Sequence, residues 1–152
     1  MTGRRDRRRA AERGSALVEL TWLGVLLLIP LGYVMLTVAT AQRHAYGVTA
    51  AARSAGRAFV LAPDVAAARQ RALAAAQLAL RDQGLTLHPA DLAITCQPTP
   101  ADCLQPGSSV HVTVRVDVRL PLVPTVLGRQ PATIAVDATH TEVYGTYRDA
   151  AP

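Results

Sequence analysis

The chain is poor in aromatic side chains and lacks the common catalytic signatures. It contains four tyrosines, one tryptophan and one phenylalanine in 152 residues, whereas half of its residues are apolar. This composition, rich in alanine, favours helices packed closely through small side chains over a deep aromatic pocket. There is no nucleophile elbow G-x-S-x-G, no zinc motif H-E-x-x-H and no phosphate loop G-x-x-x-x-G-K. We therefore expect no enzyme, no cofactor and no small-molecule substrate.

Positive charge is concentrated at the N-terminus. Residues 1–14 contain six arginines and two acidic residues, a balance of +4, so the other 138 residues carry only +1 of the net charge of +5. A basic chain can indicate nucleic-acid binding. Here, however, the charge is a terminal tag beside an apolar segment and not a basic face, so we expect no nucleic-acid partner.

Residues 20–42 contain no charged side chain. As a helix, such a run rises about 35 Å, which is enough to cross a hydrocarbon core of about 30 Å. A buried core helix of this length without a polar stripe would need a far larger protein around it. Because the arginines precede the span, the positive-inside rule places the N-terminus in the cytoplasm and the rest outside. Pro30 leaves the carbonyl of Leu26 without its helical partner, so we expect a kink there.

Glu19 is an acidic residue at the entrance to the apolar run. An ionised carboxylate near the membrane costs about 1–3 kcal/mol, depending on its depth. Glu19 could simply mark the interface, where the cost is small. It also lies five positions after Gly14, between a short basic leader and a long apolar helix. This combination resembles the class III signal of type IV pilins and pseudopilins.

The resemblance implies that an aspartyl prepilin peptidase cuts between Gly14 and Ser15, so that Glu19 becomes the fifth mature residue. In that family the glutamate is thought to pair with the N-terminal amine of a neighbouring subunit during assembly. A small first residue such as Ser15 departs from the Phe or Met of major pilins and is common among TadE-like and TadG-like members. The pattern A-A-R-S-A-G-R-A at residues 51–58 also looks like the TadE-like family, in which the membrane helix continues into an alanine-rich stalk.

The chain thus resembles a TadE-like minor pilin or pseudopilin of a tight-adherence pilus or a related secretion assembly. The implied location is a bacterial cell membrane, crossed once, with the chain retained there or incorporated into a surface pilus. The implied partners are prepilin peptidase, other pilins, the inner pilus-assembly platform and the lipid bilayer.

A second processing site competes with the first. Ala39, Thr40 and Ala41, just before Gln42, have the small-x-small form that ordinary signal peptidase recognises. The apolar run is longer than the usual 7–15 residues of a signal-peptide core, and its acidic first turn is unusual. The alternative function is therefore a generic signal-anchored or secreted envelope domain with a binding or scaffolding role.

We divide the chain into a leader (residues 1–14), a membrane helix with its stalk (residues 15–60) and an extracytoplasmic module (residues 61–152). The membrane helix is expected to continue to about Phe59, because alanine dominates and no proline intervenes. Pro63 and Asp64 open a second helix that ends near Gln83, with Gly84 as its C-cap. Its core-facing stripe comprises Val65, Ala68, Ala72, Ala76 and Leu80.

Three strands are expected after this helix. Residues 110–120 alternate strictly between apolar and polar side chains, as a strand with one buried face does. Leu92, Ile94 and Cys96 indicate a shorter strand before it. A third strand begins at Ala132 and loses its alternation at residues 140–143, which we interpret as a bulge. We expect His111 and His140 on exposed strand faces. The predicted fold is α+β, with a helix on about three antiparallel strands, which resembles a reduced pilin head.

Cys96 and Cys103 are the only cysteines. Outside the membrane, two nearby cysteines most simply form a disulfide, and a loop this short would contribute about 2–3 kcal/mol. Free thiols and a metal site are the alternatives. A metal would need further ligands at suitable spacing, and none are near, so we predict a disulfide and no metal.

Overall fold

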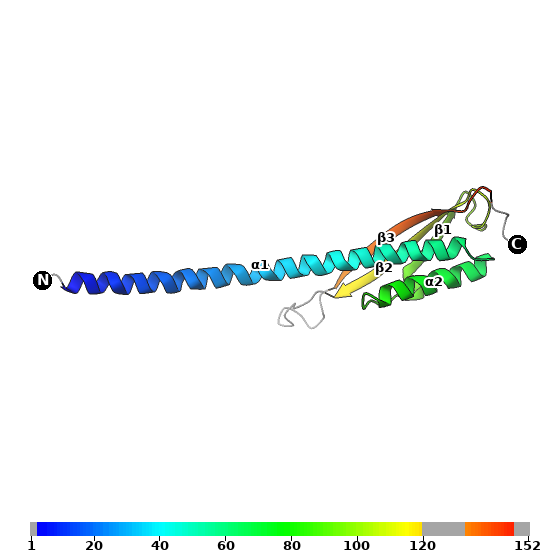
Figure 1. Ribbon diagram of the computed structural model, residues 1–152. Helices are drawn as coiled ribbons and strands as arrows, with labels where there is room; N and C mark the ends of the chain where they lie inside the picture. Colours follow the sequence, from blue (N-terminus) through cyan, green and yellow to red (C-terminus); the bar gives the residue numbers. More distant parts are fainter. Residues whose placement is uncertain (1–2, 120–132, 148–152) are drawn as a thin grey trace. The chain divides into compact units, whose positions relative to one another are not determined.

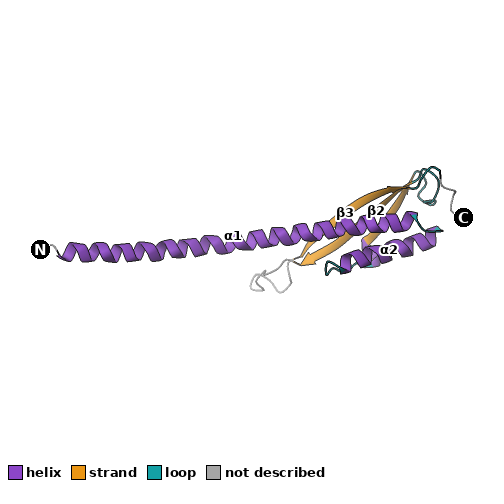
Figure 2. Cartoon of the chain, in the orientation of Figure 1, coloured by secondary structure: helices purple, strands orange, loops and turns teal. Residues whose placement is uncertain are grey.

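The computed structural model describes residues 3–119 and 133–147, with side chains from residue 16 onward. The elements along the chain are α1 (Gly3–Val60), α2 (Val65–Arg81), a 3-10 turn η1 (Pro89–Asp91), β1 (Leu92–Gln97), β2 (Ser109–Arg119) and β3 (Thr133–Val143) (Figure 1, Figure 2). The predicted α+β class is confirmed. The chain divides into two compact units, Met1–Ala39 and Thr40–Pro152.

The first unit is helical from residue 3 onward, and its side chains from residue 20 onward are largely apolar on all faces. The large apolar residues between Leu17 and Val38 are exposed. Two hydroxyls in this run are satisfied within the helix: Thr21 and Thr37 each donate to the carbonyl four residues earlier, at 2.8 Å. α1 is long and apolar enough to cross a membrane, which is consistent with single-pass anchoring. The helix continues unbroken through Pro30, and the kink there stays a prediction.

The second unit begins with the remainder of α1, which is followed closely by α2. Asp64 is the N-cap of α2: its carboxylate accepts a hydrogen bond from the Ala67 N–H at 2.8 Å. The helix ends at Arg81, two residues before the predicted Gln83. It ends there because the chain turns back at Gly84, whose φ of +71° is left-handed, and the Leu85 N–H donates to the Leu80 carbonyl at 2.9 Å.

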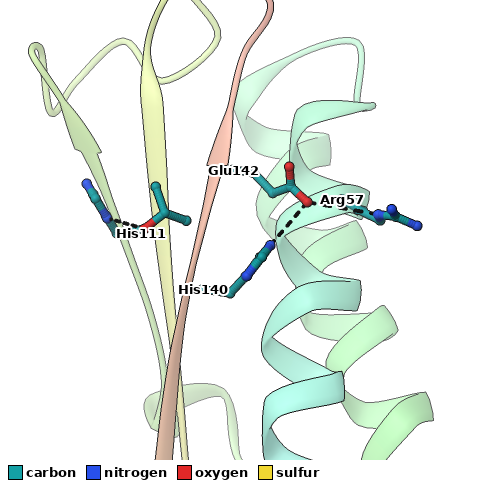
Figure 3. Close-up of polar contacts among 5 residues, drawn as sticks. Arg57, His111, His140 and Glu142 are labelled. Carbon is teal, nitrogen blue, oxygen red and sulfur yellow. Dashed lines mark hydrogen bonds and ion pairs between the residues drawn. The ribbon is translucent and has the colours of Figure 1, made fainter.

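The core of this unit is built largely from small side chains. Both helices lie on the same side of the sheet (Figure 3) and share one apolar cluster with it. The buried helical residues of this cluster include Val48, Ala51, Ala52, Ala55 and Phe59 of α1 and Ala68, Ala72, Ala76 and Leu80 of α2. Four of the five predicted stripe residues are therefore buried, and Val65 is half-buried. The stretch expected to form a stalk contributes directly to the core.

The three strands form one antiparallel sheet in the order β1-β2-β3. The predicted alternation of the central strand is confirmed, because Val110, Val112, Val114, Val116 and Val118 are all buried against the helices. Leu120 and Ala132, which bound two of the predicted strands, lie outside the described residues.

The predicted bulge in the third strand is wrong. The register between β2 and β3 is continuous from Arg119↔Thr133 to Ser109↔Val143. His140 and Glu142 therefore keep the parity of the apolar residues before them, opposite Val112 and Val110. A polar residue occurs at these helix-facing positions because the edge strand is only partly covered there.

The predicted disulfide is present. Cys96, in β1, is joined to Cys103 in the connection to β2, with their Cα atoms 5.3 Å apart. Both residues are buried. The bond closes a short loop and fixes it to the sheet.

Candidate functional site

The predicted processing and assembly residues all lie within α1. The backbone is helical through Gly14, Ser15 and Glu19. Ser15 and Glu19 are four residues apart, so they lie on one face of the helix, one turn from each other. A cut after Gly14 would leave the new amine at the start of the helix and Glu19 a single turn away.

Glu19 is exposed within an apolar surface. Its neighbours Leu17, Val18, Leu20 and Trp22 are exposed as well. Within residues 16–119 and 133–147, no side chain pairs with its carboxylate. A charge surrounded by apolar groups is penalised unless an opposite charge accompanies it. The surroundings of Glu19 therefore favour a cationic partner.

A second polar site lies in the second unit, between α1 and β3. It is an open cleft of about 370 Å³ lined by Arg53, Ser54, Arg57, His140 and Glu142, here named the Glu142 cleft. The same carboxylate oxygen of Glu142, Oε1, contacts Nε2 of His140 at 3.2 Å and Nε of Arg57 at 3.9 Å (Figure 3). The side chain of Glu142 is 26% exposed, and that of Arg57 is 81% exposed.

Gly56 makes room for this arrangement. A Cβ atom at position 56 would lie 2.9 Å from Cγ of Glu142 and 3.3 Å from Cδ2 of His140. Any larger residue would push both side chains away from the helix. The glycine thus allows two polar side chains of β3 to approach the backbone of α1.

The Glu142 cleft carries an excess of positive charge. Arg53 and Arg57 lie one turn apart on α1, and like charges at this spacing repel each other. Glu142 offsets one of them, and the other, Arg53, has no acidic partner among the described side chains. The balance is +1 when His140 is neutral and +2 when it is protonated. The cleft therefore attracts anions.

The four histidines occupy separate places. His111 lies on the face of the sheet that points away from the helices, as predicted, but it too is half-buried; its Nδ1 is 2.8 Å from the Thr141 hydroxyl (Figure 3). The prediction that His140 is on an exposed face is wrong: it is half-buried and points toward α1. His44 and His88 lie elsewhere, in α1 and before η1. Among the described residues, no three potential metal ligands gather.

Sequence reasoning missed the Glu142 cleft, although part of the signal was available. Arg53 and Arg57 share a helical face, and the three residues between them are small: Ser54, Ala55 and Gly56. The alternation of β3 continues into His140 and Glu142 once polar residues are allowed to face the helices.

Comparisons of the chain with protein-family models, with curated proteins and with solved structures found no match.

Proposed function

We propose that the chain is a TadE-like minor pilin or pseudopilin-type subunit of a tight-adherence pilus or a related secretion assembly. The observation that carries the proposal is Glu19: an exposed carboxylate at the start of an apolar helix, five positions after a glycine that follows a basic leader. Generic membrane anchors have no need for an acidic residue at this depth.

Processing has two physical consequences in this proposal. Removal of residues 1–14 takes away +4 of the chain's charge, which resists transfer across the membrane. It also creates a positive amine at Ser15. In a low-dielectric environment this amine attracts the Glu19 carboxylate of a neighbouring subunit far more strongly than it would in water. The unprocessed chain is retained in the membrane, and the processed chain assembles in a defined register.

A second candidate is a secreted or signal-anchored envelope domain with a binding or scaffolding role. The small-x-small sequence at residues 39–41 favours it. The first buried apolar residue of the core is Val48. A cut after Ala41 would therefore leave the core of the second unit complete.

The N-terminus of the protein from its native host separates the two. Intact mass and terminal peptide mapping should give a start at Ser15. A start at Gln42 would favour the secreted domain, and an intact leader would leave only a membrane anchor.

Assembly is tested with Glu19→Leu, which removes the charge and keeps an apolar helix. We expect this variant to be cleaved normally and to be lost from the high-mass assembled fraction. The matched control is Thr21→Leu, a polar-to-apolar change two residues away whose hydroxyl bonds only to its own helix. It should assemble as the wild type does. Normal assembly of Glu19→Leu would remove the proposed role of the glutamate.

A further inference from the structure

β3 presents a long edge that is suited to pairing with another strand. Its eleven residues contain no proline and no bulge. One edge pairs with β2, and among residues 3–119 and 133–147 no strand pairs with the other. The backbone N–H and C=O groups along such an edge are a template for an incoming strand.

The helix-facing side of β3 is incompletely covered. The helix-facing valines of β2 are at most 6% exposed. Their neighbours on β3 are all half-buried, and we call these the β3 strip: Ile134, Val136, Ala138, His140 and Glu142. A strand added to the free edge would place every second side chain beside this strip, about 5 Å from its residues. It would reduce the exposure of the strip, as β3 reduces the exposure of the neighbouring β2 valines.

The β3 strip is apolar at one end and polar at the other. Ile134, Val136 and Ala138 are apolar, whereas His140 and Glu142 lie at the Glu142 cleft. There Arg53 adds a positive charge that Glu142 does not offset. A strand that fits this surface has apolar side chains over the first part and an acidic one over the second.

We propose that β3 binds an extended segment of a partner protein by strand addition, and that one acidic side chain of this segment enters the Glu142 cleft. The inference uses only the second unit and does not depend on processing at Gly14 or on pilus assembly.

A second copy of this chain fits the surface less well than such a partner. Full-length antiparallel pairing of two β3 strands sets Glu142 of one copy opposite Ile134 of the other, away from the arginines. β1 also has a free edge within the described residues, but it contains no acidic residue. We therefore take the acidic side chain to come from a different protein, and self-association through β3 is an outcome of the test.

The probes are two synthetic peptides of about nine residues, a usual strand length. Both alternate valine and threonine; on the valine face, one carries a glutamate at its third residue, which antiparallel pairing along residues 134–142 sets opposite His140, and the other carries glutamine there. In each peptide, the backbone nitrogens that point to one edge carry N-methyl groups. This edge cannot form hydrogen bonds, so the peptides do not assemble into sheets with each other, and the other edge stays free to pair with β3. Each is titrated into the full-length, isotope-labelled protein in detergent micelles, and the backbone amide signals are followed by NMR.

We expect the shifts to be confined to β3 and the cleft. The glutamate peptide should bind about two- to tenfold more tightly than the glutamine peptide, since exposed charge pairs contribute modestly. This preference should disappear in about 1 M salt, where the Debye length is only about 3 Å.

Arg53→Gln should abolish the preference and leave the glutamine peptide's affinity unchanged. The matched control, Arg69→Gln, removes an equal charge from an exposed position on α2 and should keep the preference. If Arg53→Gln disturbs the fold, the proposal is tested on the wild type alone, by the difference in affinity between the glutamate and glutamine peptides and by the salt dependence of that difference. Equal binding of the two peptides, shifts at β1 in place of β3, or self-association through β3 that neither peptide displaces would overturn the proposal.

Discussion

Two leucines in α2 give a direct test of how the second unit is packed. Leu80 is fully buried, whereas Leu78, two residues earlier on the same helix, is 64% exposed. Replacing either by alanine makes the same chemical change and the same small gain in helix propensity. The difference between the two variants therefore measures burial alone.

The expected loss for Leu80→Ala follows from its environment. Three buried carbon atoms at about 0.8 kcal/mol each give about 2.4 kcal/mol of transfer free energy. The cavity that remains adds to this, so the total is about 3–4 kcal/mol, within the range seen for buried leucines. Leu78→Ala should cost less than about 1 kcal/mol, because most of its surface already contacts solvent.

The assay is thermal unfolding of the full-length protein in detergent, followed by near-ultraviolet circular dichroism in the tyrosine band. Tyr144 is buried and reports on this unit. Leu80→Ala, at about 3–4 kcal/mol, should lower Tm by roughly 12–30 °C, because a domain of this size loses about 4–8 °C per kcal/mol. Leu78→Ala should shift Tm by only a few degrees. Equal losses, or a larger loss at Leu78, would refute the packing of α2 described above.

Three further stability predictions concern the same unit. Replacing Cys96 and Cys103 together by alanine should cost about 2.5 kcal/mol, from the entropy of the short loop, and reduction of the wild type should give a similar loss in a denaturant titration. Asp64→Ala removes the N-cap of α2 and should cost about 1 kcal/mol, whereas Asp82→Ala, at the negative end of the dipole, should cost nothing. Gly84→Ala should cost about 1 kcal/mol by calorimetry, because alanine resists the positive φ.

The main elements of the second unit could be predicted from the sequence because their patterns are set by local geometry. The strict alternation of β2 has a period that only a strand can place on one buried face. The stripe of α2 has the period of a helix, and Asp64 marks its start. The disulfide followed from cysteine spacing and the expected compartment.

The Glu142 cleft could not be predicted, because it depends on how far two elements approach each other. Pattern rules assign polar residues of a strand to the solvent side. His140 and Glu142 instead face a helix, since β3 is an edge strand and Gly56 leaves space for them. That contact joins residues more than eighty positions apart, and nothing in either local sequence specifies it.

The packing of α1 inside the second unit has a mechanical consequence. This part of the helix, from Thr40 to Val60, supplies Ala51, Ala55 and Phe59 to the core. A pull along the helix axis loads these contacts together, in shear, and the whole seam must slide before any one of them is released. A unit packed in this way would resist tension with little extension, and its failure would be abrupt, at the rate of unfolding.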